Sequence, residues 1–376
     1  MTNPVFKYKY HTPDINERSI LITGGAGFIG SNVAEYLLLN GIKKVRVLDN
    51  MSNGFHRNIE PFLSNSAYEF IEGDITDAET CRKACEGIDM VTHQAALGSV
   101  PRSIKNPLAT SAANTTGFLN MLVAARDAGV KRFIYASSSS VYGDSIASPK
   151  TEKALGNPLS PYAVSKLTNE LYAAVFALHY GMEVIGLRYF NVFGPRQDPN
   201  GPYAAAIPLF MNAMLFNSAA LIYGDGSQTR DFTFVENAVQ SNIRALFTTN
   251  AEALNKVYNV AVGESVTVNE LYSHIGEITG NLKLPKYAEE RIGDIFPTQP
   301  GCEARDSLRS LGRVRDRHRV FDSKGSRSSG GHVHGGGHAQ VGRAAAGNGF
   351  RRSGQTATCH QAARRGDGRG TGRGFC

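Results

Sequence analysis

The sequence has few of the features that mark a secreted or membrane-inserted protein. No stretch reaches the ~18 consecutive apolar residues of a membrane-spanning helix, and residues 1–18 are polar and charged, without the apolar run of a signal peptide. Cysteine is scarce: the 376 residues include five, scattered without the spacing of a disulfide framework. These absences predict a cytoplasmic protein with reduced thiols and no membrane partner.

A metal site is not expected either. Cys81 and Cys85 stand four residues apart in a predicted helix, but no second pair of ligands accompanies them, and a structural zinc site needs four ligands. His332, His334 and His338 lie in a glycine-rich run. We interpret them as part of a solvated low-complexity segment.

Basic charge is concentrated near the C-terminus. The formal net charge is +7, but residues 296–376 carry 15 Lys and Arg against 5 Asp and Glu, whereas residues 1–295 carry 25 against 28. The last 81 residues also contain 17 glycines and too few apolar side chains to offset the entropy lost on ordering. Aromatic residues do not alternate with the arginines as stacking platforms, so we expect no nucleic-acid partner.

Apolar runs and helical patterns alternate from residue 19 onward. The predicted strands are 19–23, 44–49, 68–72, 90–93, 131–137 and 183–188. The predicted helices are 28–40, 106–128 and 161–180. Strands that alternate with helices form βαβ units, whose parallel sheet is covered on both faces. The predicted fold class is therefore α/β, with a Rossmann-type doubly wound parallel sheet.

A glycine-rich loop follows the first predicted strand and opens the first predicted helix. Gly24, Gly27 and Gly30 allow a tight turn and the close approach of a pyrophosphate, which the N–H groups and positive dipole end of the helix would bind. Asp49 ends the second strand, where a carboxylate binds the adenosine ribose and repels a 2′-phosphate. NAD is therefore expected as the cofactor rather than NADP.

The ends of two further predicted strands bring polar residues to the same edge of the sheet. Asp74 follows the third strand, where it is either a ligand of the adenine amine or a helix-capping residue. His93 and Gln94 end the fourth strand, just before small residues that let a backbone approach the cofactor. We interpret His93 as a core histidine and assign it no chemistry.

A second part of the chain begins after Arg188, where four prolines, at 195, 199, 202 and 208, interrupt the alternation. A strand at 257–261 is expected to return to the main sheet. The predicted regions are an N-terminal extension (1–18), an NAD-binding domain (19–190) with a returning segment near 230–263, a smaller C-terminal substrate-binding subdomain (191–229 and 264–295), and a low-complexity basic tail (296–376).

Tyr162 and Lys166 stand four residues apart, on one face of a predicted helix. An ammonium beside a phenol favours the phenolate, so we expect Lys166 to lower the pKa of Tyr162 from ~10 toward the working pH. A run of four serines, 137–140, ends the fifth strand about twenty residues upstream and offers a hydroxyl for a sugar oxygen. This spacing indicates an acid–base site rather than a chance match.

Together these motifs resemble the extended short-chain dehydrogenases of the NAD-dependent epimerase/dehydratase family. The similarity covers roughly residues 18–295 and includes the run Arg188-Tyr189-Phe190-Asn191-Val192-Phe193-Gly194-Pro195. The runs 93–103 and 226–232 look like those of bacterial UDP-N-acetylglucosamine 4-epimerases of polysaccharide biosynthesis, including the Vi-antigen type.

The resemblance implies a role for each matching residue. Ser138 matches the catalytic Ser/Thr, with Ser139 close enough to share the role, while Tyr162 is the general base and acid and Lys166 holds the nicotinamide ribose. The implied cofactor-binding residues are Gly24, Gly27, Phe28, Ile29, Gly30, Asp49, Asn50, Asp74, Ile75, Gln94, Tyr162 and Lys166. The implied substrate-binding residues are Asn191, the pyrophosphate-clamping Arg230 and Arg291, and the ribose-binding Asp294.

The implied activity is reversible 4-epimerisation of a UDP-N-acetylhexosamine (UDP-GlcNAc or UDP-GalNAc) through a 4-keto intermediate, by a homodimer. A UDP-N-acetylglucosaminuronate substrate stays open. A 4,6-dehydratase is disfavoured because Ser139 and Ser140 occupy the places of its Asp-Glu pair. From a different class, the alternatives are an inactive NAD-binding protein and an RNA-binding protein that uses the basic tail.

The sequence departs from the family after Ile295. Family members continue with a His-Ser-Leu type of run, and codons for Thr298-Gln299-Pro300-Gly301 can encode such a run when read one base later. Together with the Arg, Gly and Ala bias, this predicts that residues 296–376 are translated out of frame, or are disordered.

Overall fold

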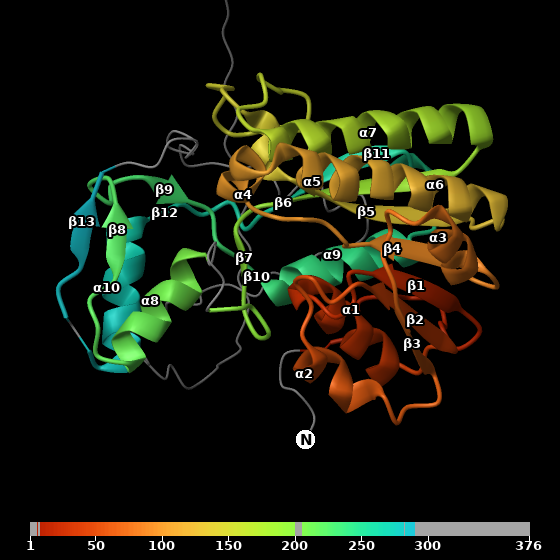
Figure 1. Cartoon of the computed structure of the whole chain (residues 1–376), viewed down its shortest axis with the longest axis horizontal. Helices are drawn as coiled ribbons and strands as arrows, with labels where there is room; N and C mark the ends of the chain where they lie inside the picture. The colour runs from red at the N-terminus through yellow and green to blue at the C-terminus, as the bar shows by residue number, and fades with distance from the viewer. Residues whose placement is uncertain (1–5, 7, 200–204, 282, 290–376) are drawn as a thin grey trace, which may run out of the picture. The chain divides into compact units, whose positions relative to one another are not determined.

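The protein is built on a seven-stranded parallel sheet, seen in a computed structural model that describes residues 6, 8–199, 205–281 and 283–289 (Figure 1). The sheet order is β11-β6-β5-β4-β1-β2-β3. The strands are β1 (Ser19–Thr23), β2 (Lys44–Asp49), β3 (Tyr68–Glu72), β4 (Met90–His93), β5 (Arg132–Ser138), β6 (Glu183–Tyr189) and β11 (Lys256–Val260). The chain reverses its direction of winding between β1 and β4, which makes this the doubly wound order of a Rossmann sheet. The predicted fold class is confirmed.

Helices cover both faces of the sheet because alternate side chains of each strand point to opposite sides. Ile20 and Ile22 belong to a core shared with α1 (Phe28–Leu39) and α9 (Val235–Phe247). Leu21 between them belongs to a second core shared with α3 (Ala78–Cys85), α6 (Gly117–Asp127) and α7 (Pro161–Tyr180). Both faces of β1 are thus buried, which explains the unbroken apolar run from Ile20 to Ile22.

Helix α7 has the boundaries that the sequence predicts. Ser160 Oγ accepts a hydrogen bond from the Ala163 backbone N–H at 3.1 Å, and Pro161 occupies the first turn. Gly181 ends the helix in the left-handed region, with φ of 66°. The first two turns, which carry Tyr162 and Lys166, are therefore held by local sequence signals.

The predicted helix 106–128 is present but not uniform. Asn106 begins it as the cap of α5 (Pro107–Ser111), and a π-helical turn, Ala112–Thr116, joins α5 to α6. A short helix, α4 (Val100–Lys105), precedes it where the sequence predicts none.

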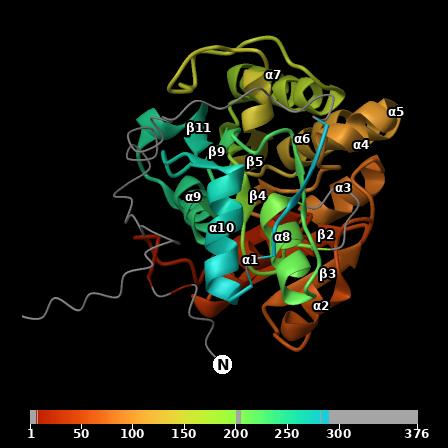
Figure 2. The same cartoon turned by 90° about the vertical axis from the view of Figure 1, so that its left-hand side faces the viewer.

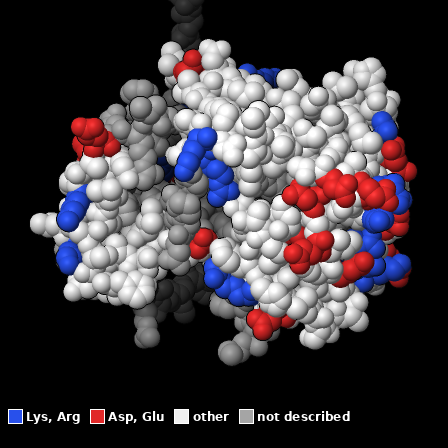
Figure 3. Space-filling model, in the orientation of Figure 1, with Lys and Arg blue, Asp and Glu red and all other residues white. Residues whose placement is uncertain are grey.

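Lys and Arg side chains gather over α4 on the face shown in Figure 3, and charges of both signs alternate around α3.

A separate hydrophobic cluster forms the smaller part of the fold. It joins α8 (Ala206–Leu215), β8 (Leu221–Tyr223) and α10 (Val268–Thr279), with Phe210 and Leu271 among its buried residues. Helices α8 and α10 pack side by side (Figure 2), and β13 (Lys286–Ala288) pairs with β8. Three short elements that also follow β6 are β7 (Val192–Phe193), β9 (Thr229–Arg230) and β10 (Thr233–Phe234). The sequence does not predict α8, β8 or β13.

The described part of the N-terminal extension packs against the outer helices. The Tyr10 ring stacks on Tyr36 of α1 at 5.1 Å, and the Tyr10 backbone N–H donates to the Tyr36 hydroxyl at 2.7 Å. The Tyr10 hydroxyl donates to Glu236 of α9. Within the residues that the structure describes, no helix is both long and apolar enough to cross a bilayer.

Candidate active site

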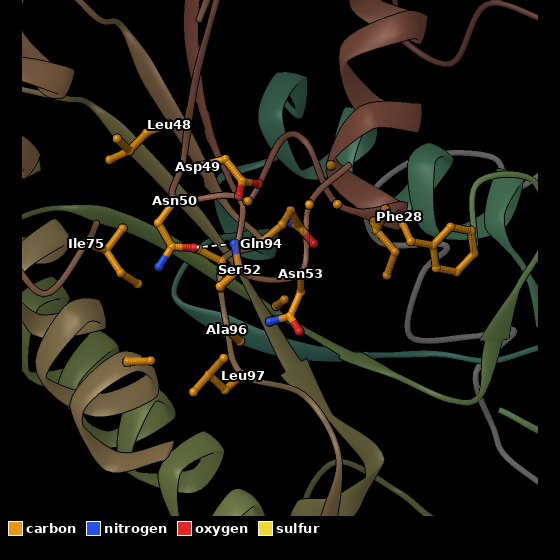
Figure 4. A pocket seen from close by; sticks show the side chains of 18 of the residues that line it. Phe28, Leu48, Asp49, Asn50, Ser52, Asn53, Ile75, Gln94, Ala96 and Leu97 are labelled. Carbon is orange, nitrogen blue, oxygen red and sulfur yellow. Dashed lines mark hydrogen bonds between the residues drawn. The ribbon is translucent and has the colours of Figure 1, made fainter. Parts of the chain in front are cut away.

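A cavity of about 430 Å³ lies at the carboxyl ends of the central strands, at the switch point where a doubly wound sheet binds ligands (Figure 4). It collects residues that the sequence places in separate motifs. The predicted site residues that line it are Gly24, Gly27, Phe28, Ile29, Gly30, Asp49, Asn50, Asp74, Ile75, Gln94, Ser138, Tyr162, Lys166 and Asn191.

The glycine loop leaves no room for side chains. Gly24 has φ of +69°, and a Cβ there would lie 2.6 Å from the Ala95 backbone nitrogen. A Cβ on Gly30 would lie 2.3 Å from the Gly24 carbonyl oxygen. Gly27 caps α1 without a side-chain hydrogen bond, so the first N–H groups of the helix are available to phosphate oxygens.

Asp49 is a buried carboxylate at the end of β2. Its oxygens accept hydrogen bonds from the backbone N–H groups of Ala26 and Met51, each at 2.9 Å. Burial raises the pKa of Asp49, and these backbone donors oppose that shift. The N–H of Ala26 thereby fixes the carboxylate directly beside the glycine loop, as a ribose ligand requires.

Asp74 is a cavity residue and not a helix cap. The cap of α3 is Asp77, which accepts hydrogen bonds from the backbone N–H groups of Glu79 and Thr80. Asp74 instead accepts from Asn50 Nδ2 at 2.7 Å and from the backbone N–H of Thr76 at 2.8 Å. Burial acts to raise the pKa of Asp74, but these hydrogen bonds outweigh it and the net shift is downward. The helix-capping alternative is therefore wrong.

Gln94 is held by two residues that the sequence does not single out. Its Nε2 donates to Asn242 on α9 at 3.0 Å, and its Oε1 accepts from the Tyr189 hydroxyl at 3.1 Å. Asn242 Nδ2 in turn donates to the Tyr189 hydroxyl at 2.7 Å. Tyr189 also lines the cavity, so this triangle fixes one wall of it.

His93 lies behind that wall. Its Nδ1 is hydrogen-bonded to Thr23 Oγ1 at 2.9 Å, and its ring packs against Phe118 and Phe133. Burial lowers the pKa of His93 to about 3. A neutral histidine packed between aromatic rings has a structural place in the core, which agrees with assigning it no chemistry.

Tyr162, Ser138 and Lys166 meet at the end of β5. The side chains of Tyr162 and Ser138 are hydrogen-bonded. Lys166 Nζ donates to the Ala136 carbonyl at 2.9 Å and lies 5.9 Å from the centre of the Tyr162 ring. Ser138 also accepts from the Ser140 backbone N–H at 3.1 Å. The hydroxyl pair and the ammonium form an acid–base unit facing the cavity.

The direction of the Tyr162 pKa differs from the expectation. Protein atoms crowd its hydroxyl, and burial raises the pKa of Tyr162, while the hydrogen bond from Ser138 opposes this shift. Burial likewise lowers the pKa of Lys166 to about 8, against the attraction of Glu170. The sequence shows that the two groups share a helix face, but not that Lys166 is buried and Tyr162 half-buried.

Ser139 and the substrate residues are placed less centrally. Ser139 begins the 3-10 turn Ser139–Tyr142 and is not among the cavity-lining residues. Asn191 and Val192 also line a second cavity of about 250 Å³, together with Arg230 of β9. Asn191 Nδ2 donates to the Asp231 carbonyl at 2.9 Å. Arg291 and Asp294 lie outside the described residues.

A family model described as the NAD dependent epimerase/dehydratase family matches residues 20–261. The chain belongs to this family. Its members use NAD, and the site fits that cofactor: a Cβ would fill the space at Gly24 and Gly30, and the Asp49 carboxylate lies beside the loop. The match also covers Ser138, Tyr162, Lys166 and Arg230, but not the described residues after 261.

Three proteins to which this chain is similar are epimerases by name. The UDP-glucose 4-epimerase of Mycolicibacterium smegmatis is 35% identical over 277 residues, which cover 73% of this chain and 87% of the relative. The solved UDP-N-acetylglucosamine 4-epimerase of Methanobrevibacter ruminantium, in complex with UDP-N-acetylmuramic acid, is 38% identical with a TM-score of 0.73 over 80% of this chain and 94% of that one. The Thermus thermophilus UDP-glucose 4-epimerase in complex with NAD is 32% identical, with a TM-score of 0.69 over 77% and 92%.

Proposed function

We propose that the protein is an NAD-dependent UDP-sugar 4-epimerase that acts on a UDP-N-acetylhexosamine in the synthesis of surface-polysaccharide precursors. The observation that carries the proposal is the Ser138–Tyr162–Lys166 unit, placed in the cofactor cavity. That cavity shares Asn191 with the second cavity, which contains Arg230. One molecule can therefore reach from the acid–base unit to a phosphate-binding arginine.

In this proposal Tyr162 accepts the proton of the sugar 4-hydroxyl and later returns it. Ser138, its hydrogen-bond partner, orients the sugar oxygen, and the Lys166 ammonium favours the phenolate. Bound NAD, held by the glycine loop and Asp49, supplies the hydride acceptor and donor at C4. The sugar must present both faces, so binding energy belongs at the pyrophosphate, where the planar fork of Arg230 grips phosphate oxygens in pairs.

The choice of hexose follows the relatives. The N-acetylhexosamine is supported by the 38% identity to a protein named UDP-N-acetylglucosamine 4-epimerase. UDP-N-acetylglucosaminuronate remains the alternative substrate. Dehydration is not favoured by the positions of Ser139 and Ser140: Ser139 does not line the cavity, and Ser140 is a buried residue of the adjacent turn.

The test is to incubate the purified protein with UDP-GlcNAc, UDP-GalNAc, their uronates, UDP-glucose and UDP-galactose, and to separate the products by chromatography. We expect interconversion of the two N-acetylhexosamines at a higher kcat/KM than of the simple hexoses. Tyr162→Phe is the matched control, because it removes one hydroxyl and keeps the ring. A wild-type protein that binds NAD but converts none of these sugars contradicts the proposal.

We also propose a homodimer formed through α5, α6 and α7. Val164, Leu171, Val175 and Leu178 recur on one face of α7, and Leu171 and Leu178 are 62% and 77% exposed. Exposed apolar stripes of this kind mark protein interfaces. Light scattering should give twice the chain mass, and Leu171→Glu should halve it, while Leu39→Glu, on an exposed position of α1, should not. A monomeric wild type contradicts the dimer.

For residues 296–376 we retain the proposal of an out-of-frame segment. An apolar groove of about 530 Å³, lined by Met211, Leu215, Ile275 and Ile278 among others, lies between α8 and α10. Leu215 and Ile278 are exposed there, which supports a missing apolar cover. We propose the frame-corrected C-terminal segment as that cover. Gene sequencing is decisive: a neighbouring frame without an apolar helical pattern after Ile295 refutes it, and a corrected chain should melt at a higher temperature.

A further inference from the structure

Three side chains one turn apart on α7 attach that helix to three consecutive residues of β5. The side chain of Tyr162 is hydrogen-bonded to Ser138, and Lys166 Nζ donates to the Ala136 carbonyl. The third side chain is Glu170, whose Oε1 accepts from Ser137 Oγ at 2.5 Å. The family roles account for the first two contacts and leave Glu170 without one.

Glu170 also belongs to a buried ion pair. Its carboxylate accepts from Arg188 Nε at 2.9 Å and from Arg188 Nη2 at 2.7 Å, and both side chains are less than a tenth exposed. Arg188 Nη1 donates to the Tyr142 hydroxyl at 3.0 Å, which donates to Asn259 Oδ1 at 2.6 Å. The network therefore ties α7 to β6, to the turn after β5 and to β11.

A buried ion pair of this kind adds little stability over apolar residues of similar size, because both charges must leave water. The position of the Glu170–Arg188 pair suggests that it benefits the active site rather than stability. Glu170 is one helical turn from Lys166, whose ammonium is itself buried, and the carboxylate attracts that ammonium. Because α7 carries both Lys166 and Tyr162, a shift of the helix along β5 would move the acid–base unit as a whole.

We propose that Glu170 is a positioning residue of the active site, which fixes α7 against β5 through Ser137 and against β6 through Arg188 and places a negative charge beside Lys166. This inference rests on the proposed function for its effect on turnover. The effect on Lys166 itself is independent of the substrate. The two can therefore be tested separately.

The opposite charges of Glu170 and Arg188 make the proposal testable by titration of Lys166. Glu170→Gln removes the anion that attracts Lys166 and leaves the Arg188 cation unpaired, so Lys166 should titrate at a lower pH, by about one unit. Arg188→Met leaves the Glu170 anion uncompensated, so Lys166 should titrate at a higher pH. The double variant removes both charges and should lie between the two. A purely structural role would move both single variants in the same direction.

The other titratable groups around Lys166 do not obscure this measurement. His93 on β4 has a pKa lowered by burial to about 3, and Tyr135 on β5 has a pKa that burial raises well above its usual value. Tyr162 is also raised in pKa, by burial. A buried group that titrates between pH 6 and 9 at this place is therefore Lys166.

The experiment is an NMR titration of the full chain with NAD, labelled with ¹³C at the lysine ε-carbon, in which the signal missing from Lys166→Met assigns the residue. We expect the order of midpoints Glu170→Gln, double variant, Arg188→Met. At pH 8 the Glu170→Gln protein should also lose about fivefold in kcat/KM, because a midpoint near 7 leaves about a tenth of Lys166 protonated. If the single variants fail to fold, Glu170→Asp and Arg188→Lys should give smaller shifts of the same opposite signs.

Unchanged midpoints, or shifts of one sign in both single variants, overturn the positioning role. If the midpoints move as expected and the wild type epimerises no UDP-sugar, the proposed function fails and the positioning role stands. If the wild type is an active epimerase and the midpoints do not move, the positioning role fails and the proposed function stands.

Discussion

Replacing Lys166 with methionine should make the protein more stable and inactive at the same time. The pKa of Lys166 is lowered from 10.5 to about 8 by burial, so holding the ammonium inside the fold costs about 3 kcal/mol at pH 7. Methionine fills similar space without the charge. It leaves the Ala136 carbonyl without its donor, a loss of about 1 kcal/mol. The net gain is about 2 kcal/mol, or about 3 °C in Tm for a chain of this size.

The pH dependence separates this explanation from a general improvement in packing. The folded-state pKa of Lys166 lies below the unfolded value, so the unfolded chain binds more protons between about pH 8 and 10.5. The cost is fully present below about pH 8 and disappears as the pH rises toward 10.5. The stability gap between Lys166→Met and the wild type should therefore narrow above pH 8.

Thermal melts at pH 7 and at pH 10, with cofactor removed from both proteins, measure the gap directly. Removal is needed because bound NAD would stabilise the protein that binds it more tightly. Lys166→Gln, which keeps a donor for the Ala136 carbonyl, is the matched control and should gain similar stability. A methionine variant that melts below the wild type at pH 7, or a gap that is the same at both pH values, refutes the reasoning.

Three further predictions concern the cofactor and the acid–base unit. Tyr162→Phe should lower kcat by 10²- to 10⁴-fold and leave the NAD Kd within about threefold, since the ring remains; equal losses in both would contradict its role in proton transfer. Asp49→Ala should weaken the binding of NAD by about tenfold or more and leave the binding of NADP little changed, because the carboxylate accepts hydrogen bonds from an unphosphorylated ribose. Calorimetry with both cofactors tests this. Gly24→Ala should weaken the binding of NAD as well, because the new Cβ would lie 2.6 Å from the Ala95 backbone nitrogen at a residue with φ of +69°. A cofactor affinity equal to that of the wild type would show that the loop can shift to accommodate the methyl group.

The sheet was predictable because its sequence signals are local. The central strands lie between two helical layers, so Ile20, Leu21 and Ile22 of β1 are buried on both faces of the sheet, and polar residues bound that run. The predicted limits of these strands, and of the helix Pro161–Tyr180, agree with the structure. Much of the cofactor cavity follows for the same reason, since strand ends, one glycine loop and the first turns of α7 contribute to its lining.

Helix α9 shows why other elements escaped prediction. Its residues Glu236, Gln240 and Asn242 are buried, which breaks the apolar pattern of a core helix. Asn242 is satisfied by hydrogen bonds to Gln94 and Tyr189. These partners come from distant segments, so the pattern of α9 has no local explanation. The same holds for Glu170, whose partner Arg188 lies on β6.

The end of β5 combines features that lower stability with features that serve chemistry. The ammonium of Lys166 and the Glu170–Arg188 pair are buried at a place where apolar side chains would fold with less cost. A cost of this size persists where activity requires the charged groups. The two predicted effects therefore belong together: variants that remove the Lys166 charge, or both charges of the Glu170–Arg188 pair, should gain stability while they lose catalytic function. The Glu170→Gln and Arg188→Met double variant extends this argument to a second position, where neutral partners should fold well and still leave Lys166 without its anion.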